Sequence, residues 1–183
     1  MKNSRNKNDK PKKNCGSNDK LGFTLVEMLL YTMVLGICLT AMAGFIDMIN
    51  GVKAKNQIIL RVERQGENIN SLIRENIVAA SNVNAPSRGT SSSTLSLAFN
   101  DATRNPTIFS LNENSITIKA GTSSVVELND PYVTAENLVF YNYGQTNAPG
   151  NISSSFSLKV GTSTDRAEFS YKKNFKLNVS RHY

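Results

Sequence analysis

The chain has 183 residues, enough for a single domain or for one long helix followed by a small domain. Gly, Ser, Asn and Thr are abundant and Trp is absent, which favours a loop-rich β domain over a helical bundle. Residues 1–22 carry seven basic and two acidic side chains, so +5 of the net charge of +7 lies at the N-terminus. This distribution argues against a broadly basic folded domain. Nucleic-acid binding by the basic tail remains only an alternative.

The sequence carries no signature of an active site. Its one His is the penultimate residue, and its two cysteines, Cys15 in the basic tail and Cys38 in an apolar run, are not placed to form a disulfide. We find no Gly-rich phosphate loop, metal-ligand cluster or paired-carboxylate motif. Asp130 and Asp165 fall in expected turns without calcium-loop spacing. We therefore expect no enzyme activity, catalytic residue, metal or cofactor.

Residues 1–20 are polar and rich in Lys and Asn, which predicts disorder. Residues 28–46 contain no charged side chain, and together with the apolar residues before them they reach the roughly 20 residues that a helix needs to cross a bilayer. We therefore predict a transmembrane segment at 23–46. Glu27 interrupts it near its start and requires a specific explanation.

Residues 47–80 contain no Pro, and their apolar residues recur at intervals of three, four and seven, as on one face of a helix. These residues are Ile58, Ile59, Val62, Ile69, Leu72, Ile73, Ile77 and Val78. We predict one continuous helix over 23–80, whose second half packs against a domain through this stripe. The alternative is two helices with a break near Gly51.

After a Pro-, Gly- and Ser-rich loop at 81–94, the apolar period changes to two, as in β-strands. The expected strands lie at 94–100, 107–111, 115–120, 123–129, 137–143 and 154–160, with one or two more in 166–180. We expect six or seven strands in one antiparallel sheet that forms a domain over 81–183. The predicted class is α+β: a long N-terminal α-helix packed on a C-terminal antiparallel β-sheet domain.

The most specific motif is the sequence GFTLVE at 22–27, which stands behind a basic leader and ahead of a charge-free helix containing Gly36. It closely resembles the type III signal of bacterial type IV prepilins and type II secretion pseudopilins. About 25 residues carry the resemblance. It implies a pilin-like fold, which agrees with the class predicted from periodicity.

The resemblance implies that a prepilin peptidase cleaves between Gly22 and Phe23 and methylates the new amine of Phe23. Residues 1–22 are then the leader peptide. Gly22 lets the backbone lie extended in a protease cleft, and the basic leader stays on the cytoplasmic side. A carboxylate in the bilayer is unfavourable unless it is paired, and the resemblance supplies the Phe23 amine of a neighbouring subunit as the partner of Glu27 in filament assembly. The alternative is that Glu27 snorkels to the interface.

The chain departs from the family pattern in three places, and the missing Pro at Gly44 is the one that favours a minor subunit. Leu21 stands where Lys or Arg usually precedes the Gly, the leader is longer than is common, and Gly44 stands where major subunits typically carry Pro. The β domain also has no Cys pair. The pattern after residue 133 is most similar to J-type minor pseudopilins, with H-type subunits and competence pseudopilins as alternatives.

The expected product is a minor pseudopilin in the cytoplasmic membrane, with a single span and an extracytoplasmic C-terminal domain. It would join a short, envelope-spanning filament of a type II secretion or type IV pilus-like machine, at initiation or at the tip. The implied partners are the prepilin peptidase, other major and minor pilin-like subunits, and, indirectly, an assembly platform and ATPase. Secretion, DNA uptake and a surface pilus all remain open.

One alternative is an ordinary secreted β-rich protein. Residues 41–43, before Gly44, fit a signal-peptidase site, although the apolar run is near the upper limit for a signal peptide.

The other alternative is a DNA-uptake or adhesive subunit that binds a ligand through its β domain. Basic and aromatic residues alternate near the C-terminus: Lys172, Lys173, Lys176, Arg181 and His182, with Tyr171 and Phe175. On a strand, Lys172 and Lys176 share a face and Lys173 does not, so a solvated edge strand protected by lysines also explains the pattern.

Overall fold

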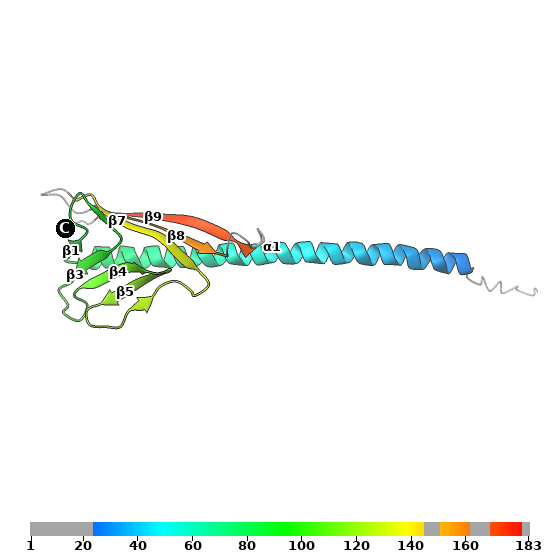
Figure 1. Cartoon of the computed structure of the whole chain (residues 1–183), viewed down its shortest axis with the longest axis horizontal. Coiled ribbons are helices and arrows are strands. Elements are labelled where there is room, and N and C mark those ends of the chain that lie inside the picture. The colour runs from blue at the N-terminus through cyan, green and yellow to red at the C-terminus, as the bar shows by residue number, and fades with distance from the viewer. Residues whose placement is uncertain (1–23, 145–150, 162–168, 181–183) are drawn as a thin grey trace, which may run out of the picture. The chain divides into compact units, whose positions relative to one another are not determined.

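The computed structural model describes residues 24–144, 151–161 and 169–180. The chain divides into two compact units, Met1–Phe45 and Ile46–Tyr183. Figure 1 shows the one long helix, α1 (Leu25–Ala79), and strands that are grouped into two antiparallel sheets. The protein is therefore α+β, with a long N-terminal helix packed on antiparallel β-sheets, as the sequence predicts.

Helix α1 has 55 residues and ends one residue before the predicted boundary. It continues through Gly44 and Gly51, so the alternative of a break near Gly51 is wrong. The reason is that an isolated Gly weakens a helix by only about 1 kcal/mol, whereas Pro, which would interrupt it, does not occur between its ends.

The second unit buries one face of α1. The predicted apolar residues that are at most 2% exposed are Val62, Ile69, Ile73 and Ile77. Val78, predicted in the same stripe, is 61% exposed, because it is rotated by about 100° around the helix axis from Ile77. Gly66 and Asn76 complete the buried face. The prediction missed both because neither is apolar.

The first sheet has the strand order β1-β3-β4-β5-β6. Its strands are β1 (Asn82–Ala85), β3 (Leu95–Ala98), β4 (Thr107–Asn112), β5 (Ser115–Ala120) and β6 (Val126–Glu127). The strands predicted at 107–111 and 115–120 are confirmed as β4 and β5, which form a hairpin with Asn112 opposite Ser115 across a two-residue turn. Of the strand predicted at 123–129, only the two residues of β6 are paired.

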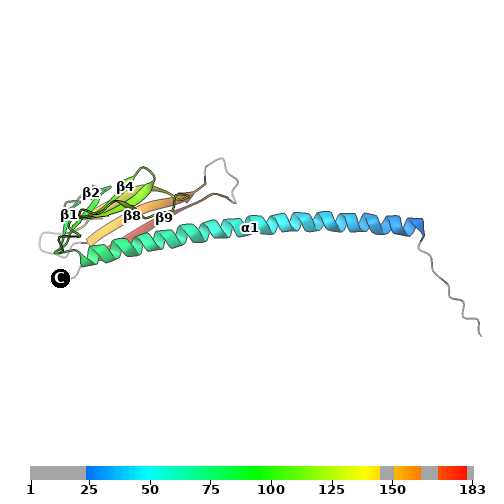
Figure 2. The same ribbon diagram turned by 90° about the horizontal axis from the view of Figure 1, so that it is seen from below.

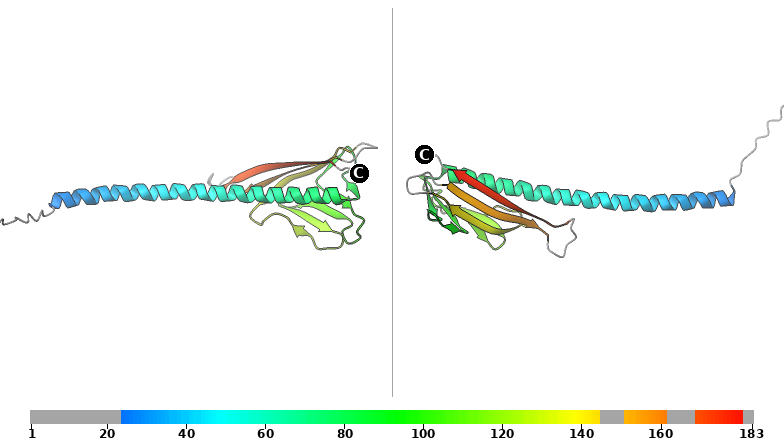
Figure 3. Two further views of the ribbon diagram at one scale, coloured as in Figure 1. Left: turned by 180° about the vertical axis from the view of Figure 1, so that it is seen from behind. Right: turned by 90° about the horizontal axis from the view of Figure 1, so that it is seen from above.

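The second sheet has the order β2-β7-β8-β9. Its strands are β2 (Ser91–Ser92), β7 (Thr134–Asn142), β8 (Asn151–Val160) and β9 (Tyr171–Ser180). The C-terminal region forms one long strand in its described part, β9, rather than two. Both sheets lie on the same side of the C-terminal part of α1 in Figure 2, and β9 runs beside that part of the helix in Figure 3.

The prediction of a single sheet with six or seven strands is wrong: the described residues form nine strands in two sheets. Two of these strands, β1 and β2, come from the predicted loop at 81–94. Beyond β6, the Leu128 amide still donates to the Ile116 carbonyl at 2.8 Å, and the side chain of Asn129 then takes the place of further strand pairing. Its Oδ1 accepts from the Ile116 amide at 2.8 Å, and its Nδ2 donates to the Val133 carbonyl. Asp130 lies in a turn, as predicted, and its backbone carbonyl accepts a hydrogen bond from the Val133 amide at 2.9 Å.

One hydrophobic core joins α1 to both sheets and contains the fully buried rings of Phe109, Phe140 and Phe156. Phe175 of β9 fixes the helix to the second sheet. Its ring stacks on Phe156, with centroids 5.3 Å apart, and lies directly on the backbone of Gly66, where a Cβ would overlap the ring. Only a residue without a side chain allows this close approach.

Candidate processing and assembly site

The candidate site lies at the start of α1. Gly22 and Phe23, the predicted cleavage and methylation residues, lie outside the described residues, so both assignments remain predictions. Helix α1 begins at Leu25, the third residue after the predicted cleavage position. The helix therefore starts almost at the N-terminus that cleavage would create.

Thr24 caps this helix. Its Oγ1 accepts from the Glu27 amide at 3.3 Å, and its carbonyl accepts from the Met28 amide at 3.2 Å. Ser or Thr followed three residues later by Glu is a known signal for a helix N-terminus. The sequence reading missed this role of Thr24, although the spacing of Thr24 and Glu27 contains it.

Glu27 has two favourable interactions within its own helix. It lies in the first turn of α1, where the helix dipole favours a negative charge. The Tyr31 hydroxyl, one turn further on, donates to Glu27 Oε1 at 3.3 Å. Tyr31 was also missed, although its spacing of four residues from Glu27 places the two side chains on the same face.

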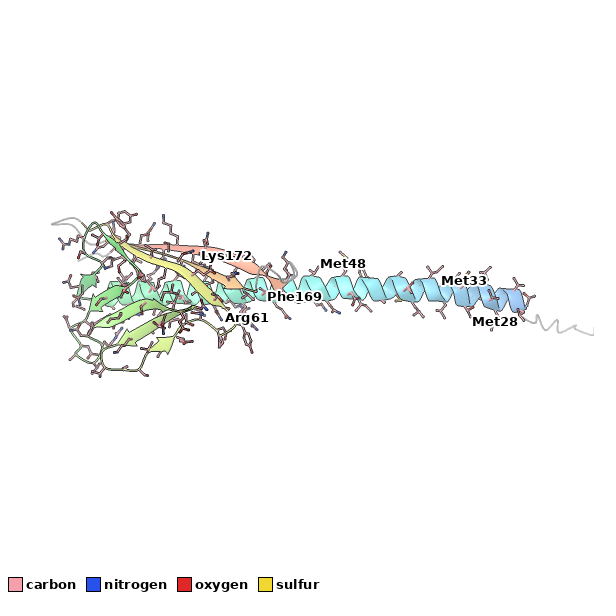
Figure 4. All side chains as sticks on the ribbon, viewed as in Figure 1. Met28, Met33, Met48, Arg61, Phe169 and Lys172 are labelled. Atoms are coloured by element: carbon pink, nitrogen blue, oxygen red, sulfur yellow. The ribbon has the colours of Figure 1, made fainter. Side chains whose placement is uncertain are left out.

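The side chains that follow are apolar and uncovered. Every large apolar side chain of α1 between Leu25 and Phe45 is at least 50% exposed. Figure 4 shows Met28 and Met33 projecting from this stretch. Continuous apolar exposure of this extent marks a surface that lipid or another protein covers.

The hydroxyl groups in this stretch are satisfied by the helix itself. Thr32 donates to the Leu29 carbonyl at 2.9 Å, and Thr40 donates to the Ile37 and Gly36 carbonyls at 2.9 and 3.2 Å. Such bonds remove the need for water at these positions. The segment is therefore compatible with an apolar solvent despite its two threonines.

Among the described residues, α1 is the one helix that is long and apolar enough to cross a membrane. This property rests on length and composition alone. A signal sequence near the N-terminus would have the same property.

The C-terminal basic residues do not form one surface. As predicted, Lys173 points to the opposite face from Lys172 and Lys176, and its Nζ lies 2.9 Å from Glu63 Oε1 on α1. The hydrogen bond to Glu63 raises the pKa of Lys173. Phe175 is buried in the core. Arg181 and His182 lie outside the described residues.

On the other face of β9, Lys172, labelled in Figure 4, donates to Glu136 Oε2 on β7 at 2.6 Å. This hydrogen bond, with the lysine charge, lowers the pKa of Glu136. The two lysines that share this face therefore differ. Lys172 is paired, whereas Lys176 makes no ion pair with any residue in the described part of the chain.

A metal-binding site is not apparent: the described residues contain no group of three or more His, Cys, Asp or Glu side chains that could hold an ion. No protein-family model, curated protein or solved structure matches this chain. A functional interpretation therefore rests on the sequence motif and on the geometry above.

Proposed function

We propose that the chain is the precursor of a type IV pilin-like minor pseudopilin. Cleavage between Gly22 and Phe23 and methylation of Phe23 produce a subunit that joins a short filament of a type II secretion or type IV pilus-like machine. The observation that carries the proposal is the start of α1. A capped helix with one carboxylate, Glu27, in its first turn continues into an uncharged, exposed apolar stretch directly behind the motif.

Both stages of this pathway would cover the apolar helix. Before assembly, the bilayer surrounds residues 23–46 while the β domain lies outside the cytoplasm. After assembly, equivalent helices of neighbouring subunits replace the lipid, through close packing of apolar and small side chains. Gly36 and Gly44 are open positions, since a Cβ at either would meet nothing within 4 Å beyond the adjacent backbone of its own helix.

Glu27 gives the assembly its register. In the filament, its carboxylate pairs with the methylated Phe23 amine of a neighbouring subunit. Removing one partner of such a buried pair costs about 3–5 kcal/mol, because the other charge is left without a partner. The pairing therefore selects one axial position over all others.

The decisive experiment is the mass and sequence of the mature N-terminus, from cells with and without a prepilin peptidase. We expect a methylated Phe23 that disappears when the peptidase is absent. Gly22→Val should block cleavage, because a branched side chain cannot enter a cleft that accepts Gly. Gly16→Val, the matched change within the leader, should leave cleavage intact. An N-terminus at Gly44 that is independent of the peptidase would instead identify an ordinary secreted protein.

A second experiment separates assembly from processing. Glu27→Gln should be cleaved and inserted normally, yet its incorporation into filaments should fall by about a hundredfold or more, as the loss of a buried ion pair predicts. Asp47→Asn, the matched acid-to-amide change on the same helix, serves as the control. Normal incorporation of Glu27→Gln would refute the pairing.

A further inference from the structure

The outer face of the β2-β7-β8-β9 sheet has a shape and chemistry that the proposed filament role does not use. Helix α1 packs on the opposite face, where Phe175 meets Gly66. The strand register places one row of outward-pointing side chains on each of β7, β8 and β9. The row on the central strand β8 consists of Asn151, Ser153, Ser155, Ser157 and Lys159.

The β8 row forms the floor of a shallow trough. Ser153 and Ser157 point away from α1 but are only 8% and 5% exposed, because longer side chains on both neighbouring strands flank them. The flanking residues are Tyr141 and Glu136 on β7 and Asn178 and Asn174 on β9. The floor is also ordered, since Ser157 donates to Asn174 Oδ1 at 2.7 Å.

Two cavities, of about 350 and 430 Å³, lie along this trough. Amide and hydroxyl side chains make up at least half of the lining residues of each, and Lys176 lines both. Asn and Ser side chains can donate and accept hydrogen bonds at the same position. This pattern suits a ligand whose own groups also do both, as the hydroxyls of a sugar chain do.

The charge of the trough is small and local. Lys172 is held by Glu136, so its charge is largely compensated. Lys176, between the two cavities, is exposed and makes no ion pair with the described residues. Lys159, at the end of the β8 row, likewise makes no ion pair with the described residues. The trough therefore presents two available cations, Lys176 and Lys159, among many neutral hydrogen-bonding groups.

An aromatic pair stands at one end. The rings of Tyr141 and Tyr143 have centroids 4.2 Å apart, and Tyr143, which lines the first cavity, is 58% exposed. The Tyr141 hydroxyl donates to the Gly89 carbonyl at 3.1 Å, which fixes its ring. An exposed ring with a polar tip can cover the apolar face of a sugar while its hydroxyl remains hydrogen-bonded.

We propose that this trough, along Ser153, Ser155 and Ser157, with Tyr143 at one end and Lys176 near its middle, binds a linear acidic polysaccharide. The sugar hydroxyls bond to the Ser and Asn side chains, one carboxylate lies against Lys176, and a sugar ring lies on Tyr143. A single-stranded DNA fits less well, because its backbone carries no free hydroxyls to bond to the Ser and Asn side chains, and its binding depends mainly on neutralising phosphates. The trough stands on the β domain alone and is independent of N-terminal processing.

The test uses the full-length chain in detergent micelles and measures its affinity for hexagalacturonate by calorimetry. Fully methyl-esterified hexagalacturonate is the uncharged matched probe, and a twelve-residue oligothymidylate is the nucleic-acid probe. We expect the acidic hexasaccharide to bind most tightly. Lys176→Gln should raise its Kd about fivefold, in line with the loss of an exposed ion pair. Lys119→Gln, on β5 of the other sheet, removes the same charge and should leave the Kd unchanged.

Ser155→Val separates hydrogen bonding from charge. Ser155→Val should weaken the binding of both saccharides, whereas Lys176→Gln should weaken the binding of the acidic saccharide alone. Unchanged thermal unfolding of each variant verifies that the fold is intact. The proposal is overturned if hexagalacturonate does not bind, if Lys119→Gln and Lys176→Gln act equally, or if the esterified probe or the oligothymidylate binds more tightly.

Discussion

Gly66→Ala tests whether the contact between helix and strand holds the β domain to α1. Ala favours a helix over Gly by about 1 kcal/mol, so helix propensity alone predicts stabilisation. The new Cβ would overlap the Phe175 ring, which is only 4% exposed and is backed by Phe156. Overpacking of this kind costs about 1–3 kcal/mol, and a rigid ring without room to move belongs at the upper end. We therefore expect a net loss of about 2 kcal/mol.

The assay is thermal unfolding of the full chain in detergent, followed by circular dichroism in the β region. A loss of about 2 kcal/mol lowers the Tm by roughly 5–10 °C for a unit of this size. Gly44→Ala, on the same helix but with nothing within 4 Å of the new Cβ beyond the adjacent helix backbone, should leave the Tm of the β domain unchanged. Phe175→Leu combined with Gly66→Ala should cost less than the sum of the two single changes. A neutral or stabilising Gly66→Ala would refute the contact.

Three further predictions concern polar contacts. Lys172 lowers the pKa of Glu136 in the folded protein below 4.5, so the stability that this pair contributes is present above pH 4.5 and is lost as the pH falls through the folded-state pKa. Lys172→Met should therefore flatten the acid side of the stability profile, which thermal melts between pH 2 and 7 would detect. Asn129→Leu should lower the free energy of unfolding by about 3–5 kcal/mol in urea titrations, because a buried amide and a buried carbonyl lose their partner. Tyr31→Phe removes the hydrogen bond to Glu27 and should make the free energy of membrane insertion, measured by glycosylation mapping, less favourable by about 1 kcal/mol. In a Glu27→Gln background the same substitution should have a smaller effect on insertion.

The sequence predicted most accurately what depends on local periodicity. Short patterns along the chain indicate the end of the helix, its buried face with Ile69 and Ile73, and the two strands β4 and β5. The arrangement of the strands in two sheets could not be predicted from local periodicity. In the described part of the chain, no strand pairing joins β3, β4 and β5 to β7, β8 and β9, and the two added strands, β1 and β2, consist largely of polar residues without a strand pattern. Sequence patterns do not contain such pairings, because the partners are distant along the chain.

The same distinction applies to the candidate sites. Glu27 was identified because a carboxylate in an apolar run is conspicuous. Thr24 and Tyr31 were missed, although their spacings of three and four residues from Glu27 indicate a helix cap and a contact on the same face. The trough on β8 required the register of three strands. The strand predicted at 154–160 gives no sign of a trough, because the cavities arise from small side chains that lie between larger ones on the neighbouring strands.

The hydrogen bonds of α1 also bear on how assembly can be specific. In the apolar stretch after Glu27, the hydroxyls of Thr32 and Thr40 are already bonded to helix carbonyls, so they offer little to a neighbouring helix. An ionised carboxylate accepts about four hydrogen bonds, and Tyr31 supplies one to Glu27. Glu27 therefore retains acceptor capacity in a stretch whose other polar side chains are satisfied. A neighbour's amine would find its strongest attraction there, and that difference is what would fix the register of one subunit against the next.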